Sequence, residues 1–134
     1  MSVMFALLLA QAAEAAAPTP TREEEKEIVV MARKAAWWRG FWQNKDGVTT
    51  CATRTSTGDA EVDKILCDGL VDCAPRYIPE MEAVVRARQA AGATITPENI
   101  EKILAPVQAK IRRCARASSR GPFIALIRAR KAAR

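Results

Sequence analysis

The 134-residue chain contains no histidine, and its six glycines are scattered. A histidine base activates most catalytic serines and many catalytic cysteines, and imidazole is a frequent zinc ligand. The missing histidine therefore excludes Ser-His and Cys-His nucleophile pairs and most zinc sites. The glycines form no phosphate-binding loop. We expect a non-enzymatic protein without catalytic residues or a cofactor.

The usual spacings of calcium and thiol redox sites are also missing. Residues 59–63, DAEVD, place acids at alternate positions, as a calcium loop does. The glycine at loop position six and the glutamate at position twelve are absent, so no metal site is expected. Cys67 and Cys73 do not form a C-x-x-C motif, which argues against a redox pair. Asp59 is better explained as a helix cap.

No long apolar run follows the first residues, so the chain lacks a later stretch of the ~20 apolar residues that span a bilayer. The chain begins MSVMFALLLAQAAEAAAPTP, an apolar run followed by small residues, as in a secretory signal. The cleavage pattern fits after Ala15 or Ala17, but Pro18 would hinder the second cut. We therefore expect residues 1–15 to be a signal peptide. No cysteine follows the run, so no lipid anchor is expected. Because no later apolar run is long enough to span a bilayer, no membrane anchor should remain after cleavage.

Four cysteines are present, which is compatible with export. An even number of cysteines in a short exported chain predicts a disulfide framework, because oxidising compartments preserve such bonds. They are Cys51, Cys67, Cys73 and Cys114. We expect a periplasmic or secreted protein held together by two disulfides.

The stretch from Gly47 to Cys73 carries three of these cysteines. Asp46-Gly47 is a two-residue hairpin signal, since glycine accepts the positive φ of a type I′ turn, and a hairpin is expected over residues 41–55. Residues 56–59, STGD, supply capping groups for a helix. This helix should end at Pro75. Its apolar stripe comprises Val62, Ile65, Leu66, Gly69 and Cys73.

The predicted helix limits how the cysteines can pair. Cys67 and Cys73 would stand ~9 Å apart along it, beyond the ~7 Å reach of a disulfide. Two connectivities remain: Cys51 with Cys67 and Cys73 with Cys114, or Cys51 with Cys73 and Cys67 with Cys114. We favour the first, because Cys73 and Cys114 lie on the apolar stripes of two helices that should face each other.

Three further helices are predicted after Pro75. Residues 80–91 carry an apolar stripe and stop at Gly92. Thr96-Pro97-Glu98 is a helix start, and the stripe that follows reaches Cys114. Pro106 should kink this helix near Ile103. Residues 118–122 should end it, and residues 122–134 should form a last amphipathic helix.

Residues 16–32 are expected to be a mobile segment before a single domain of residues 33–134. Within that segment, residues 27–33 are rich in β-branched side chains and predict a short strand. The tryptophans follow at Trp37, Trp38 and Trp42. We expect Trp38 and Trp42 to pack on the hairpin and helices, and the alternative is that the cluster forms an exposed aromatic surface for a partner.

The last third of the chain is strongly basic. Ten lysines and arginines follow Glu101, and no acid does. Such an end suggests attraction to an anionic lipid surface or an acidic envelope protein, and export disfavours nucleic acid as the partner. We take Arg128, Arg130 and Lys131, together with the three tryptophans, as candidate partner-binding residues. A solvated face that keeps the protein soluble is the alternative.

Two short stretches resemble parts of the TonB system. Residues 27–33, EIVVMAR, resemble the TonB box of outer-membrane TonB-dependent transporters, with Met31 where threonine is usual. Residues 47–67 are similar to the start of the periplasmic C-terminal domain of TonB-type energy transducers. The matching residues are Gly47, Cys51, Ser56, Gly58, Asp59, Asp63 and Cys67. The second resemblance implies a strand, a turn and a helix with a Cys51–Cys67 bridge, in an envelope setting.

Neither resemblance transfers an activity, because no barrel follows the first and the closing strands of the family do not follow the second. The chain also resembles, in style, small exported proteins of alphaproteobacteria, from which no function can be transferred. The expected fold is α+β and mostly α: an N-terminal β-hairpin packed on three to four helices and stapled by two disulfides. The expected function is that of an envelope interaction module, with anionic-surface binding through the basic C-terminal helix as the alternative.

Overall fold

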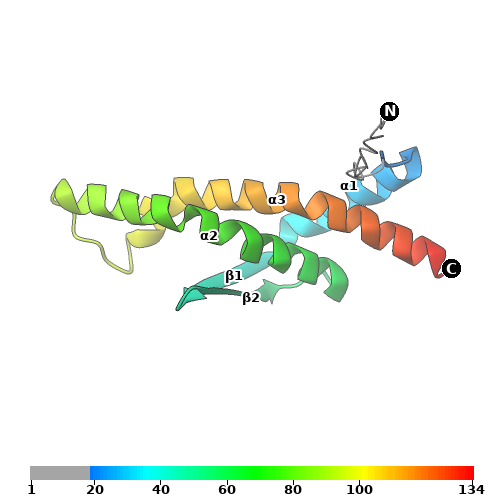
Figure 1. Cartoon of the computed structure of the whole chain (residues 1–134), viewed down its shortest axis with the longest axis horizontal. Helices are drawn as coiled ribbons and strands as arrows, with labels where there is room; N and C mark the ends of the chain where they lie inside the picture. The colour runs from blue at the N-terminus through cyan, green and yellow to red at the C-terminus, as the bar shows by residue number, and fades with distance from the viewer. Residues whose placement is uncertain (1–18) are drawn as a thin grey trace, which may run out of the picture.

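A computed structural model describes residues 19–134, and the predicted signal peptide lies outside them. The chain forms α1 (Arg22–Trp37), β1 (Arg39–Lys45), β2 (Val48–Thr55), α2 (Ala60–Ala90) and α3 (Ile100–Ala132) (Figure 1). The expected class, a mostly helical fold with one antiparallel hairpin, is confirmed.

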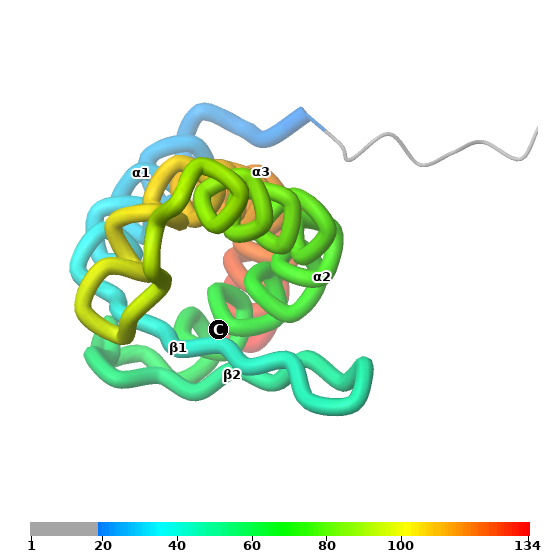
Figure 2. Tube along the Cα trace, turned by 90° about the vertical axis from the view of Figure 1, so that its left-hand side faces the viewer, coloured from blue at the N-terminus to red at the C-terminus, as the bar shows by residue number. Residues whose placement is uncertain are grey.

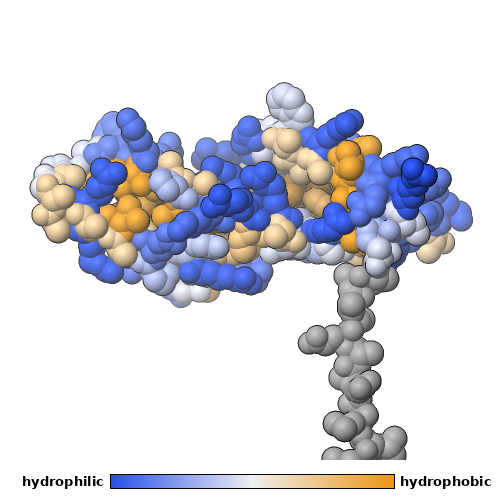
Figure 3. Space-filling model, turned by 90° about the horizontal axis from the view of Figure 1, so that it is seen from above, coloured by the Kyte–Doolittle hydropathy of each residue, from blue (hydrophilic) through white to orange (hydrophobic). Residues whose placement is uncertain are grey.

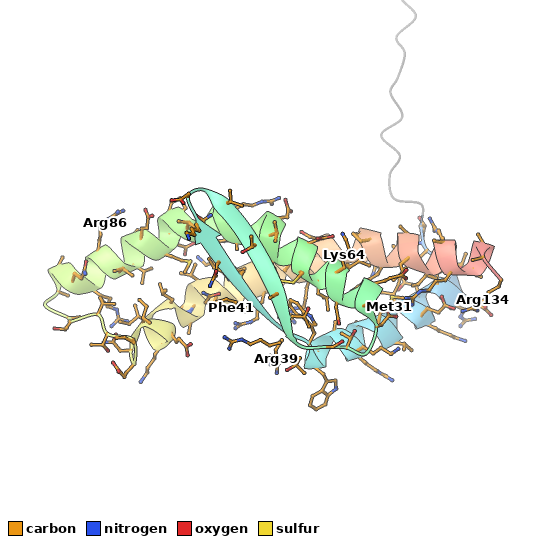
Figure 4. The ribbon with its side chains drawn as sticks, turned by 90° about the horizontal axis from the view of Figure 1, so that it is seen from below. Met31, Arg39, Phe41, Lys64, Arg86 and Arg134 are labelled. Carbon is orange, nitrogen blue, oxygen red and sulfur yellow. A yellow bond between two sulfur atoms is a disulfide. The ribbon has the colours of Figure 1, made fainter. Side chains whose placement is uncertain are left out.

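The two long helices, α2 and α3, run antiparallel and form the length of the molecule (Figure 1). Helix α1 packs against the C-terminal half of α3, and the hairpin lies across α2 (Figure 4). A view along the long axis shows the three helices around the middle and the hairpin on one side (Figure 2). The short α1 and the hairpin therefore cover only one end and the middle of the long helices.

The core consists of two clusters along the α2–α3 contact. The first lies between α1, the start of α2 and the end of α3, and comprises Ile28, Met31, Val62, Leu66, Phe123, Ile124 and Ile127. The second lies further along and comprises Leu70, Cys73, Ala74, Val107, Ile111 and Ala115. Every stripe residue expected on the first half of α2 is buried, except Ile65, which is half-buried.

Gly69 lies where the two clusters meet and lets α2 and α3 approach closely. A Cβ at this position would stand 3.0 Å from the carbonyl oxygen of Ala115 and 3.3 Å from Oγ of Ser119. Both distances are tighter than ordinary contact, so a larger side chain would push the helices apart.

No residue between Ala74 and Val107 is buried. This part of α2 and α3, residues 75–106, extends as a two-helix arm beyond the hairpin (Figure 1). Its apolar side chains remain half-exposed because nothing in residues 19–134 covers the outer sides of the two helices. Figure 3 shows apolar atoms at this end of the molecule among hydrophilic ones.

The hairpin prediction is confirmed. Lys45 pairs with Val48 across a two-residue turn in which Asp46 and Gly47 have φ values of 53° and 79°. The start of α2 is confirmed as well, since the Asp59 side chain accepts hydrogen bonds from the backbone N–H groups of Glu61 and Val62. In the turn and in the helix cap, the residues that determine the backbone conformation lie within a few positions of one another in the sequence.

The expected breaks at proline are wrong. Helix α2 continues through Pro75 and Pro79, so residues 80–91 are not a separate helix. Helix α3 continues through Pro106 and Pro122, so residues 122–134 are not separate either. All four prolines are exposed, so their rings lie on the outer sides of the helices. Packing on the opposite face keeps each helix intact, although the C-terminal part of α3 slopes away from its first part (Figure 1).

The strand expected at residues 27–33 is also wrong, because these residues lie in α1. Thr21 and Glu24 form a reciprocal capping box, and acids occupy the first turn, so the helix start is well defined. Ile28 and Met31 then pack into the first cluster at helical spacing. Burial of these side chains outweighs the β preference of Val29 and Val30.

The start of α3 was predicted a few residues early. The Thr96 hydroxyl accepts from the backbone N–H of Asn99, and the Asn99 side chain accepts from the backbone N–H of Thr96. A turn over residues 97–99 follows, and regular helix begins at Ile100.

Candidate interaction surfaces

Two disulfides join the elements of the fold. Cys51 bonds to Cys67 and ties β2 to α2, with 5.5 Å between their Cα atoms. Cys73 bonds to Cys114 and ties α2 to α3, with 5.9 Å between their Cα atoms. The favoured pairing is confirmed, and none of the four cysteines is free. The disulfides hold the hairpin and both long helices in one rigid unit.

Two of the three tryptophans belong to the folded interior. Trp38 is half-buried and packs against both core clusters, and its indole N–H donates to Oγ1 of Thr53 at 3.0 Å. Its ring lies over Gly40, where a Cβ would collide with the indole carbons. Trp42 packs against the second cluster. These two tryptophans fasten the hairpin to the helices rather than forming a free surface.

Trp37 is different, because 76% of it is exposed. It ends α1, and Val29 and Val30, which are 46% and 50% exposed, lie two turns earlier. Residues 29, 33 and 37 share one side of a helix because they are four residues apart. We call Val29, Val30, Arg33 and Trp37 the outer face of α1. Apolar atoms are visible in Figure 3 at the end of the molecule that carries this helix.

Cationic groups border the outer face of α1 on the hairpin side (Figure 4). Arg39 donates to the carbonyl oxygens of Ala36 and Trp38 at 3.0 and 2.9 Å, and so places a cation at the C-terminal end of α1. Phe41 is 40% exposed, and the Arg54 guanidinium lies 4.9 Å from its ring centre. Phe41, near the outer face, is therefore held beside the Arg54 guanidinium.

The basic end of α3 is tied to acids on the other helices. Arg128 donates to Glu24 on α1 at 2.7 Å, and Glu24 is only 4% exposed. The hydrogen bond from Arg128, and then that from the Thr21 backbone, lower the pKa of Glu24 from 4.5 to about 2. Arg120 pairs with Glu25 at 2.6 Å. These bonds hold α1 against α3.

Arg130 makes a second set of contacts, with the start of α2. It bonds to Asp59 at 2.9 Å and to Glu61 at 2.8 Å. The hydrogen bond from Arg130 lowers the pKa of Asp59, and the two acids together raise the pKa of Arg130. Arg128 and Arg130 are therefore engaged within the fold, whereas Lys131, the third basic residue expected to bind a partner, is exposed.

A group of three arginines on the middle of α3, Arg112, Arg113 and Arg116, was not singled out from the sequence. All three are exposed and form no ion pair within residues 19–134. Their spacing could have predicted this basic group, since residues 112 and 116 are one turn apart on the same side of the helix. Which arginines are paired is decided by α1 and α2, and the sequence does not show it.

Asp63 has a structural role that the sequence did not predict. Burial favours the neutral acid, but hydrogen bonds from Ser56 and Thr57 outweigh this and lower the pKa of Asp63. Thr57 donates its backbone N–H at 2.8 Å and its hydroxyl at 2.7 Å. The carboxylate ties the loop after β2 to α2.

Two shallow hollows lie on the surface. One of about 560 Å³ lies between the hairpin turn and the arm, lined by Trp42, Asn44, Ile78, Met81, Glu82, Val85 and Arg86. The other, of about 310 Å³, lies where α1 meets the start of α2 and the end of α3. It is lined by Lys26, Glu27, Val30, Met31, Lys34, Asp59, Val62, Ile127, Arg130, Lys131 and Arg134.

No three His, Cys, Asp or Glu side chains in residues 19–134 are grouped so that they could hold a metal ion. Over the same residues, none of the helices is both long enough and apolar enough to cross a membrane. No protein-family model, curated protein or solved structure matches the chain.

Proposed function

We propose that this protein is an exported, non-enzymatic interaction module of the cell envelope, and that the outer face of α1 binds a partner protein. The observation that carries the proposal is the exposure of Trp37 beside Val29 and Val30. Tryptophan contributes disproportionately to the binding free energy at protein interfaces. Arg33 and Lys34 supply the polar rim that such interfaces have.

Rigid support for α1 favours this role. The capping box, the bond from Arg128 to Glu24 and the contacts of Arg39 hold both ends of the helix. A surface that is already ordered loses little conformational entropy when a partner binds. The proposal therefore uses α1 as a folded helix. Strand addition by residues 27–33, as in a TonB box, would require α1 to unfold and expose Ile28 and Met31.

The two disulfides support export. Both join separate elements of the fold, and bonds of this kind persist in oxidising compartments. A non-enzymatic role is supported by the use of Glu24, Asp59 and Asp63, whose carboxylates are occupied by capping, loop and arginine contacts. In this interpretation the cysteines serve stability rather than redox chemistry.

Site-specific photocrosslinking tests the docking surface. A photoreactive phenylalanine analogue at Trp37, in full-length protein expressed in an exporting bacterial host, should crosslink one envelope protein. The same analogue at Lys64, an exposed position on α2 (Figure 4), is the control and should not capture that protein. Adding Val29→Ser and Val30→Ser should abolish the crosslink from position 37. Equal capture from both positions, or no capture, would contradict the proposal.

Mass spectrometry of the recovered protein tests export separately. The mass without reduction should correspond to loss of residues 1–15 and to two disulfides, and thiol labelling should require reduction. An intact N-terminus with four reactive thiols would overturn the envelope setting.

A second candidate function is binding to an anionic lipid surface through Arg112, Arg113 and Arg116. These side chains are exposed and unpaired within residues 19–134, so their charge is available, at about 1 kcal/mol for each cation near such a surface. Retention on vesicles with anionic headgroups should fall with salt and should be lost in the triple Gln variant of these arginines. Retention that salt and this variant leave unchanged would exclude the candidate.

A further inference from the structure

The hollow at the α1 end, which we call the α1–α3 groove, combines an apolar floor with a basic rim. Helix α1 contributes one side, the first turn of α2 contributes Val62, and the last turns of α3 close the other side. Met31 and Arg134 lie at this end of the molecule (Figure 4). Residues distant in the sequence thus meet in one hollow of about 310 Å³.

The floor belongs to the first core cluster. Met31, Val62 and Ile127 are 8%, 1% and 2% exposed, so their positions are set by packing on all other sides. Val30, which is half-exposed, stands beside them. An apolar group that enters the groove meets a preformed surface, so little reorganisation opposes its binding.

The rim carries an excess of positive charge. Five cations and two acids line the groove. One cation and one acid, Arg130 and Asp59, form an ion pair with each other. Glu27 is the remaining acid. Lys26, Lys34, Lys131 and Arg134 form no ion pair within the described residues. The rim therefore favours an anion beside the apolar floor.

The remaining lining chemistry narrows the ligand class. Every side chain in the groove is either charged or apolar, and no hydroxyl or amide side chain lines it. A hydrocarbon chain with one anionic head needs only apolar contact and positive charge, the two kinds of contact that dominate the groove. The volume is at the low end of the range for small-molecule sites, ~300–1,000 Å³.

We propose that the α1–α3 groove binds a single-chain anionic amphiphile of the fatty-acid type. Its hydrocarbon chain lies against Val30 and the exposed edge of Met31, above the buried Val62 and Ile127. Its carboxylate is held by the long, flexible side chains of Lys26, Lys34 and Lys131, which reach from the rim while their stems cover apolar surface. The groove shares Val30 and Lys34 with the partner surface proposed above, but Met31, Val62, Ile127, Lys26 and Lys131 belong to the groove alone.

Calorimetric titration with dodecanoate below its micellar concentration tests the proposal, with full-length protein in its oxidised form. Wild-type protein should bind dodecanoate, and should bind acetate and dodecyltrimethylammonium about tenfold more weakly or not at all, because each lacks one of the two contacts. A triple variant, Lys26→Gln, Lys34→Gln and Lys131→Gln, should weaken dodecanoate binding by about tenfold or more. Val30→Asn should weaken it as well, at an exposed position where folding tolerates the change.

The matched control removes three charges elsewhere on the surface. Arg112→Gln, Arg113→Gln and Arg116→Gln make the same change in net charge and should leave dodecanoate affinity unaltered. Absence of binding by the wild type, equal weakening by both triple variants, or equal affinity for the cationic amphiphile would overturn the proposal. Vesicle retention that depends on the groove lysines, without binding of free dodecanoate, would assign the site to a membrane surface and overturn it too. The crosslink from Trp37 is measured on protein with wild-type groove residues, so its failure and the failure of dodecanoate binding are separate results.

Discussion

Removal of the Cys73–Cys114 disulfide should destabilise the fold more than removal of the Cys51–Cys67 disulfide. The two bonds close loops whose ends are 41 and 16 residues apart. A cross-link restricts the unfolded chain more when the loop is longer, and the chain-entropy relation assigns about 4 kcal/mol to the first bond and about 3 kcal/mol to the second. Both values are large beside the 5–15 kcal/mol that stabilises a typical domain.

Burial adds to this difference. Cys73 is fully buried in the second core cluster, whereas Cys51 and Cys67 are half-buried. Replacing Cys73 with alanine leaves a void of about one sulfur atom, which costs about 1 kcal/mol. We therefore expect a loss near 5 kcal/mol for Cys73→Ala with Cys114→Ala, against a loss near 3 kcal/mol for Cys51→Ala with Cys67→Ala.

Urea unfolding followed by tryptophan fluorescence and far-ultraviolet circular dichroism measures both losses. The two double variants and the wild type should be compared under oxidising conditions, and the reduced wild type should be less stable than either variant. Equal losses in the two double variants would refute the loop-closure argument. So would a loss below about 1 kcal/mol for the longer loop.

Three further predictions test the packing and the charges. Gly69→Ala should destabilise the fold by about 1 kcal/mol net in urea unfolding, because a close contact with α3 outweighs the better helix propensity of alanine. The control Gly121→Ala has open space around it and should stabilise the fold by about the same amount. Glu24→Gln should flatten the fall in thermal stability between pH 4.5 and pH 2: the pKa of Glu24 is lowered on folding, so its contribution is complete above 4.5 and disappears as the pH falls through about 2. An unchanged pH profile would contradict that assignment. Trp37→Ala should alter stability by less than about 0.5 kcal/mol, whereas Trp38→Ala should lose about 3 kcal/mol, and equal losses would mean that Trp37 is buried.

Several features of the fold could be predicted from short-range signals. The Asp46-Gly47 turn needs positive φ at two adjacent residues, and Asp59 caps the helix that begins beside it. The geometry of that helix keeps Cys67 and Cys73 apart, which left two pairings, and the positions of Cys73 and Cys114 on two apolar stripes favoured the pairing that the structure has. In each case the interacting groups are close in the sequence or lie on one regular helix.

The errors have a common origin in tertiary packing. Proline weakens a helix locally, but α2 and α3 continue through Pro75 and Pro106 because the stripes on their opposite faces pack. Residues 27–33 have β-prone side chains, but burial of Ile28 against α3 stabilises the helix. Local propensity is worth a few tenths of a kcal/mol per residue, and burial of one large apolar side chain is worth about 2 kcal/mol.

The candidate surfaces were predicted least well. The sequence alone identified the tryptophans and the basic C-terminal part, because composition and charge need no folding. It named Trp38 and Trp42 as the tryptophans that pack on the hairpin and helices, where both are half-buried, but it did not single out the adjacent Trp37 as exposed.

The amino-acid sequence by itself thus determined the hairpin and the helix faces and reduced the cysteine pairing to two connectivities, since these depend on turn geometry, capping and helical spacing. Only the tertiary structure decided which charges are neutralised and which apolar groups remain open. Arg128 meets Glu24 across 104 residues, and Arg130 meets Asp59 across 71. Such contacts depend on how α1 and α2 pack against α3, and no local pattern encodes that packing.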